Sequence, residues 1–332
     1  MIRWVFDTFP TLTELVYGQV LFPSLRWVLD YTLGLIPFPS LYLFLAFIVF
    51  AFVKSIFGIN RLWQNPQKKI LSILNFWAWL LSSFLIVWGF NYQRPEIAER
   101  LEFKEIQLRT SAYDRLVERS IDKLESIQYQ DQEFNGVSIN LDIDELRRAQ
   151  GAFLENLGYV KAGNVQLETL YPNGILSSFG ISGIYLPWVG QGNVDGCLSN
   201  LEKPFIAAHE MAHAYGVTNE GEASFVAYMT CWASKNDLYR YSAEIYLLRN
   251  LLFRLKIRDE KHYQYWLSKI PKKVKQDIAF IKEHRTQFPN LMPELSVQLN
   301  NTYLQSQGIE SGSKSYGELI ELLYSWSYER PQ

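Results

Sequence analysis

The sequence predicts a mainly α-helical protein of the α+β class, with two or three N-terminal transmembrane helices followed by a mostly helical domain. Three observations predict this class. Two long uncharged stretches precede residue 92, charged sequence with apolar residues at helical spacing follows it, and only one short run has β-type character. The 332 residues therefore divide into an apolar N-terminal segment (1–37), a membrane segment (38–92) and a large domain (93–332).

The two uncharged stretches are each long enough to cross a bilayer. The first lies before Lys54 and has an unbroken apolar core from Leu41 to Val53, and the second runs from Ile70 to Phe90. A helix needs about 20 apolar residues to cross the hydrocarbon core. Neither stretch has the polar stripe that a soluble helix would show. We therefore expect two spans.

The loop between these spans indicates their orientation. It carries four basic residues and no acidic one, namely Lys54, Arg61, Lys68 and Lys69. Such a bias is typical of cytoplasmic loops. We expect a multi-pass protein of the cytoplasmic membrane, in contact with the lipid bilayer and with its large domain on the extracytoplasmic side.

The segment from Thr11 to Leu35 allows two interpretations. It is fairly apolar but contains Glu14, Arg26 and Asp30, so it is either an interfacial helix or a third span. Both leave the basic loop and the large domain on the same sides.

In the large domain, apolar residues at helical spacing predict amphipathic helices over Glu96–Leu124 and Asp144–Leu157. The run from Ile181 to Leu186 predicts one strand, which Pro187 ends. Beyond Pro204 the chain is predicted to be helical almost to its end, with the first three helices over Pro204–Tyr215, Asn219–Ser234 and Tyr241–Leu255.

Charge and cysteine content exclude some kinds of site. The formal net charge is −2 with mixed signs throughout, which argues against nucleic acid as a partner. The two cysteines, Cys197 and Cys231, are too few for a disulfide framework or a cysteine-based zinc site. A single Cys197–Cys231 bridge and two buried thiols both remain open.

The pentapeptide from His209 to His213, HEMAH, points to metal chemistry. Pro204 in the first helical turn and Gly216 just past the end define its helix. Histidines four apart lie on one face and can bind one ion, while Glu210 is aimed at the bound water as a general base. We expect a zincin-like domain with Zn²⁺ as cofactor, His209 and His213 as ligands and Glu210 as the catalytic base.

A catalytic zinc ion needs a third protein ligand. The next predicted helix offers Glu220 and Glu222, which lie on different sides of it because they are two residues apart. Apolar neighbours of Glu222 favour it as the third metal ligand. The alternative is that Glu222, three residues after the predicted N-cap Asn219, only completes a capping box.

The stretch from His209 to Tyr228, HEMAHAYGVTNEGEASFVAY, resembles the signature of the DUF3810 family of bacterial membrane proteins, which is similar to HEMAHxxGxxxEDEANFxAY. Further similar motifs are Ile36–Ser40, Gly180–Pro187, Arg240–Ser242, Tyr303–Leu304 and Ser315–Gly317. The segment around Glu222 also resembles, more distantly, the third-ligand segment of ImmA/IrrE-type metallopeptidases.

This resemblance implies an HExxH zinc metallopeptidase of gluzincin type anchored in a membrane. It also implies that the second glutamate of EDEAN, here Glu222, is the third ligand. The chain departs from the pattern with Gly221 in place of Asp and Ser224 in place of Asn. Neither is a metal ligand, but the hydrogen bonding around a ligand could differ.

Two supporting features are expected. The strand Ile181–Leu186 is either an edge strand to which a substrate adds or an ordinary buried strand. Tyr241 either donates a hydrogen bond to the oxyanion, as a second catalytic residue beside Glu210, or is a packed tyrosine.

The function expected is hydrolysis of peptides or proteins outside the membrane. The alternative is a non-catalytic membrane scaffold or interaction protein stabilised by zinc, which would not need Glu210. An intramembrane protease is disfavoured because His209 lies more than 100 residues beyond the second span in charged sequence.

Overall fold

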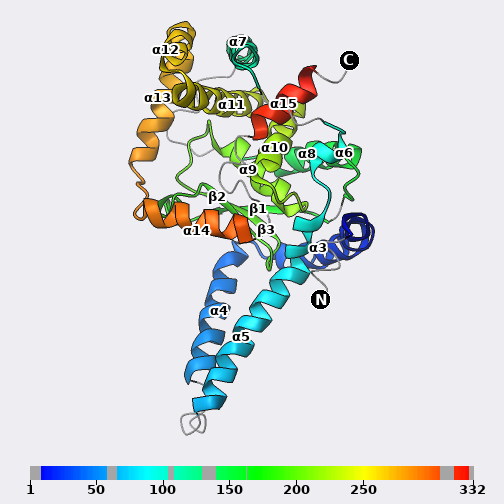
Figure 1. Ribbon diagram of the computed structural model, residues 1–332. Coiled ribbons are helices and arrows are strands. Elements are labelled where there is room, and N and C mark those ends of the chain that lie inside the picture. The colour runs from blue at the N-terminus through cyan, green and yellow to red at the C-terminus, as the bar shows by residue number, and fades with distance from the viewer. Residues whose placement is uncertain are drawn as a thin grey trace.

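The computed structural model describes residues 9–57, 66–103, 108–128, 140–161, 163–306 and 318–328. It is mainly helical with one three-stranded sheet, as the sequence predicts. Figure 1 shows a helical domain from which one antiparallel helix pair extends. The sheet lies at the end of the domain where this pair enters.

The extended pair consists of α4 (Ser40–Phe57) and α5 (Pro66–Val87), at the positions of the two expected spans. By length and composition, Gln67–Val87 is a helix that could cross a membrane. A second candidate within the described residues is the bent pair Pro10–Leu35 and Ser40–Ser55, which turns through 99°. The described part of the chain therefore offers one or two candidate spans where the sequence predicts two or three. Arg61 of the basic loop lies outside the described residues.

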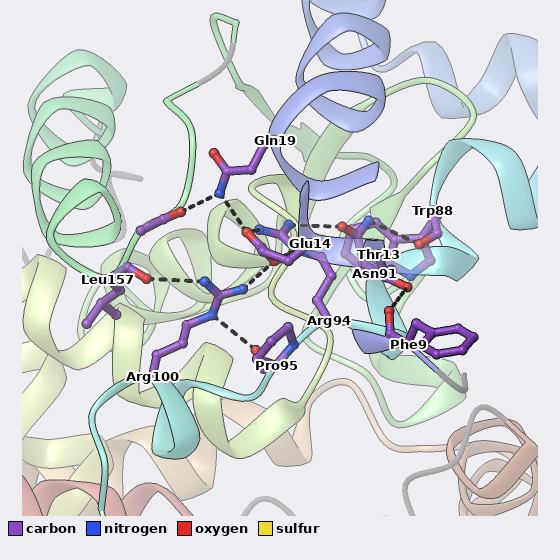
Figure 2. Close-up of polar contacts among 11 residues, drawn as sticks. Phe9, Thr13, Glu14, Gln19, Trp88, Asn91, Arg94, Pro95, Arg100 and Leu157 are labelled. Atoms are coloured by element: carbon purple, nitrogen blue, oxygen red, sulfur yellow. Dashed lines mark hydrogen bonds and ion pairs between the residues drawn. The ribbon is translucent and has the colours of Figure 1, made fainter. Parts of the chain in front are cut away.

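The N-terminal segment is a chain of short helices packed beside the domain: α2 (Pro10–Thr13), η1 (Glu14–Leu21), α3 (Phe22–Asp30) and η2 (Leu33–Leu35). Its charges have partners in the protein. Glu14 accepts from Arg94 (Nε–Oε2 2.8 Å) and from Arg100 (Nη2–Oε2 2.5 Å), as Figure 2 shows. Arg26 pairs with Asp30, and both side chains are 1% exposed. Buried charges need such partners, so this segment is held to the domain.

The amphipathic region predicted over Glu96–Leu124 is not one helix. It forms α6 (Ile97–Arg100) and α7 (Thr110–Ser126), and Glu102 between them has a left-handed backbone with φ of 57°. The second amphipathic prediction is confirmed by α8 (Ile143–Asn156). Apolar periodicity identified both amphipathic regions, but it did not show that the first one is interrupted between α6 and α7.

The sheet has the order β1-β3-β2, with β1 (Gln166–Leu170) parallel and β2 (Gly183–Leu186) antiparallel to β3 (Gln191–Asp195). The strand predicted from Ile181 is confirmed as β2. The short helix η6 (Ser177–Phe179) precedes it. β3 is buried throughout although its sequence is QGNVD. Buried Asp195 accepts hydrogen bonds from backbone N–H groups of the loop before β2, which satisfies its charge.

The three central helices agree with their predicted ranges to within a few residues. They are α9 (Lys203–Ala214), α10 (Glu220–Ala233) and α11 (Asp237–Arg258). All of α9 is buried, and it packs against α8, α10, α11 and the sheet. Beyond them lie α12 (Glu260–Lys269), α13 (Lys272–Thr286), α14 (Pro293–Ser306) and α15 (Glu318–Tyr328). The core of the domain thus surrounds α9, the helix that carries the HExxH motif. The short helix η4 (Gly89–Gln93) follows α5.

Candidate metal and catalytic site

The two motif histidines meet on one face of α9, as their spacing predicts. Their Nε2 atoms are 3.2 Å apart and both side chains are buried. Oε2 of Glu220, the first residue of α10, lies 3.0 Å from Nε2 of His209 and 3.5 Å from Nε2 of His213. One ligand atom from each residue lies within 4.8 Å of the others. Two imidazoles and one carboxylate in this arrangement suit a zinc ion with an open fourth position.

The second nitrogen of each histidine is also held. Nδ1 of His213 lies 2.8 Å from the carbonyl oxygen of Val217, to which it can only donate. This leaves Nε2 of His213 as the nitrogen with a free lone pair for a metal. Nδ1 of His209 lies 3.2 Å from Oγ of Ser224. Such outer contacts orient metal-binding imidazoles in known sites, so the donor set fits the ion.

The ionisation of this cluster follows from burial and proximity. Burial works against the imidazolium of His213, but the Glu220 carboxylate beside it raises its pKa to about 9. Burial likewise works against the Glu220 carboxylate, but His213 and the hydrogen bonds of both imidazoles hold its pKa well below the ordinary value. Burial lowers the pKa of His209. Without metal, Glu220 is the counterion of a protonated His213, and a bound cation would replace that proton.

The structure corrects the expected position of Glu222. Residues two apart on a helix point about 200° away from each other, and it is Glu220 that faces the histidines. The Glu222 carboxylate lies on the other side of α10, where its Oε1 accepts hydrogen bonds from the backbone N–H groups of Ile97 and Ala98 at the start of α6. It is therefore a buried cap for α6.

The capping-box alternative for Glu222 is half realised. Oδ1 of Asn219 accepts from the backbone nitrogen atoms of Gly221 (2.7 Å) and Glu222 (3.1 Å), so Asn219 is the predicted N-cap. The Glu222 side chain turns to α6 and not back to the cap. Burial, together with repulsion from nearby Glu96, raises the pKa of Glu222 to about 8. Its apolar neighbours face the domain core, which is why they misdirected the sequence prediction.

A series of hydrogen-bonded side chains lies behind His209, and the position of one of them, Ser224, could have identified Glu220 from the sequence. Ser224 lies four residues after Glu220, hence on the same face of α10, and it hydrogen-bonds His209. Tyr246 of α11 forms a side-chain hydrogen bond with Ser224, and its ring stacks on Phe205 at 3.8 Å between centroids. The sequence prediction missed both Tyr246 and the role of Ser224.

Glu210 points away from the face of α9 that carries His209 and His213, and it lies against the sheet. A Cβ atom at Gly183 would come within 2.6 Å of its Oε1, and one at Gly192 within 3.2 Å of its Cβ. These two glycines therefore make room for Glu210. Burial raises the pKa of Glu210 to about 8, although His213 and a hydrogen bond from the Tyr185 backbone act in the opposite direction. A carboxyl group with a pKa near neutrality is suited to accept and return a proton.

β2 lies at an edge of the three-stranded sheet, beside α9. The backbone of Ser182 pairs with Asp195 (N–O 2.9 Å), and the register continues through Ile184 opposite Asn193. Alternate residues of an antiparallel strand face opposite sides. The backbone groups of Gly183 and Tyr185 therefore point to the free edge, where Glu210 lies.

Tyr241 is not brought to the histidines. Its side chain is 1% exposed, and its hydroxyl donates to Asp277 of α13. The packed tyrosine is the alternative that the structure supports, because α11 turns this side chain towards α13. The two cysteines are free and buried, Cys197 near Ser177 and Cys231 under α9.

Comparison with known proteins gives one result. Residues 17–324 match the model of a family described as protein of unknown function (DUF3810). No curated protein and no solved structure matches the chain. The match covers nearly all of the domain, the candidate metal site and the whole of the helix pair, and so the chain belongs to the DUF3810 family.

Proposed function

We propose that this protein is a membrane-anchored zinc metallopeptidase. The observation that carries the proposal is the convergence of His209, His213 and Glu220, which together could supply three metal ligands. A further carboxyl group, that of Glu210, lies beside them and is not needed as a ligand. A purely structural zinc site would need no such carboxyl group. Its position beside the free edge of β2 is the position that a general base for a bound peptide requires.

The chain's own residues would divide the work as follows. His209, His213 and Glu220 would hold a zinc ion, which supplies a Lewis acid for the scissile carbonyl and an acidified water. Glu210 would accept the proton of the attacking water and return it to the leaving amine. The outward backbone groups of Gly183 and the outward carbonyl group of Tyr185 would pair with the substrate as an added strand, because the Tyr185 N–H already donates to Glu210.

We further propose that α4 and α5 are two spans in the cytoplasmic membrane. The basic residues Lys54, Lys68 and Lys69 near their connection favour a cytoplasmic loop, which puts the site on the extracytoplasmic side. The partners of Glu14, Arg26 and Asp30 inside the protein favour a docked N-terminal segment over a third span.

Substitution of the base tests the peptidase. Purified Glu210→Gln protein should bind one zinc ion, as measured by elemental analysis, and should not cleave a peptide library that the wild type cleaves. Glu118→Gln, on the exposed face of α7, is the matched control and should retain both properties.

Equal cleavage by Glu210→Gln would overturn the mechanism. A wild-type protein that binds zinc stoichiometrically and cleaves no peptide, soluble or membrane-anchored, would instead support a zinc-stabilised scaffold.

A further inference from the structure

We propose that the substrate is a membrane-anchored polypeptide, cleaved within a few residues of the bilayer surface. This inference rests on the peptidase function proposed above and specifies its substrate class. It follows from the height of the site above the membrane, from the rigid mounting of the domain, and from the apolar surface around the helix pair.

The candidate metal site lies in contact with the residue that follows α5. The 21 residues Gln67–Val87 extend over about 31 Å at 1.5 Å per residue, which matches a hydrocarbon core of about 30 Å. Val87 would then lie at the boundary of that core. The next residue, Trp88, packs its ring 6.3 Å from that of His213 and 4.9 Å from that of Tyr185. One aromatic side chain thus separates the metal site from the end of the span, so the site is about 10 Å above the boundary, near the headgroup region.

Hydrogen bonds fix this height. Ser40 N at the start of α4 donates to Gln191 Oε1 (2.8 Å), and Tyr42 Oη donates to the Tyr171 carbonyl oxygen (2.5 Å). Tyr17 Oη donates to the carbonyl oxygen of Ile86 in α5 (2.9 Å). The domain is mounted on the helix pair through these contacts and not through a flexible stalk, so it cannot lift the site away from the membrane.

The substrate-binding strand also reaches the helix pair. Trp188, two residues beyond the end of β2, stacks on Phe44 of α4 (5.0 Å) and contacts Phe84 of α5 (5.6 Å). Its Nε1 donates to Oγ of Ser83 (3.0 Å). A peptide paired with β2 would therefore have one end at the membrane-facing end of the domain.

Two apolar surfaces flank the helix pair. Figure 1 shows α3 and α14 on either side of the point where α4 and α5 enter the domain. The first carries exposed Trp27 and Val28, and the second exposed Leu295 and Leu299. Apolar faces with interfacial aromatic residues are typical of helices that lie on a bilayer. Because these surfaces are continuous with the spans, lipid is the occupant that fits them. Their contact with lipid would bring the metal site to the bilayer surface.

A series of anchored substrates tests the inference. One cleavable sequence is joined to a transmembrane anchor through flexible spacers of increasing length and reconstituted with the protein in liposomes, with the soluble peptide at equal bulk concentration. A flexible spacer of n residues reaches about 5–6 Å × √n, so a site about 10 Å high is best served by about 3–4 residues. The cleavage rate should be highest there and should fall about threefold at about 40 residues, as the mean reach grows threefold.

The outcomes separate the two proposals. Equal rates for the soluble and anchored peptides, or a rate that rises up to the longest spacer, would overturn the membrane-proximal substrate while leaving the peptidase intact. Cleavage of no substrate in any format would count against the peptidase itself.

A spin label gives an independent readout of the mounting. In nanodiscs, a label at Leu299→Cys should be relaxed more by lipid-soluble oxygen than by a water-soluble nickel chelate, and one at Glu118→Cys on the distant α7 should show the opposite. The native cysteines are buried, so labelling favours the introduced one. Equal access of the chelate to both positions would overturn the proposed seating on lipid.

Discussion

The assignment of the third metal ligand can be tested with a pair of isosteric substitutions, Glu220→Gln and Glu222→Gln. Both residues lie at the start of α10, and each substitution replaces a carboxyl group with an amide of nearly the same shape. Oε2 of Glu220 lies 3.0 and 3.5 Å from the two histidine Nε2 atoms, whereas Oε1 of Glu222 accepts from backbone nitrogen atoms of α6. We expect the first substitution to weaken zinc binding and the second to leave it unchanged.

The size of the effect follows from the number of ligands. Zinc sites in small domains are worth about 10–16 kcal/mol, which over four ligand positions is about 2.5–4 kcal/mol each. Loss of Glu220 should therefore weaken the affinity by roughly 10²- to 10³-fold, since about 1.4 kcal/mol corresponds to tenfold. Competition with a chelating zinc indicator at pH 7.5 measures it. If Glu222→Gln lost the zinc and Glu220→Gln kept it, Glu220 would not be the third ligand.

Three further predictions concern the surroundings of the site. Ser224→Ala removes the hydrogen bond to His209 and should weaken zinc binding by about 10- to 100-fold; an unchanged affinity in the same competition assay would contradict the role of Ser224. Gly183→Ala should abolish cleavage but retain zinc, because its Cβ would lie 2.6 Å from Oε1 of Glu210; activity near that of the wild type would show that Glu210 needs no such space. The pKa of Glu222 is raised to about 8 from an ordinary 4.5, so the fold favours the protonated form of this side chain. Its contribution to the stability of the protein is therefore complete below pH 4.5 and is lost as the pH rises to 8. Glu222→Gln stays neutral and should be more stable than the wild type at pH 8, by about 4 to 5 kcal/mol, with no advantage at pH 4.5; thermal melts that differ equally at both pH values would contradict this.

Several parts of the site were predictable because they depend on local geometry. Helical spacing alone puts His209 and His213 on one face. Asn219 caps its helix and Gly216, with φ of 92°, ends the preceding one, because capping involves only neighbouring residues. The strand β2 was equally visible, since its apolar, β-branched run is bounded by glycine and proline.

Other parts depended on packing between distant segments. β3 was missed because its sequence is polar. It can be buried only because the loop before β2 donates backbone hydrogen bonds to Asp195. The place of Tyr241 in the chain left open whether it reaches the oxyanion or packs elsewhere, and the orientation of α11 sends it to Asp277.

The sequence by itself determined the helix that carries the HExxH motif, the shared face of its two histidines and the apolar helix pair, because periodicity, capping and hydropathy are properties of neighbouring residues. Only the tertiary structure decided between Glu220 and Glu222. Both are buried carboxylates on one helix, and which of them meets the histidines depends on the rotation of α10 against α9 and on α6, whose free N–H groups receive Glu222. The tertiary structure also decided how close the site lies to α5, because Trp88 and His213 are 125 residues apart in the chain and adjacent in the fold.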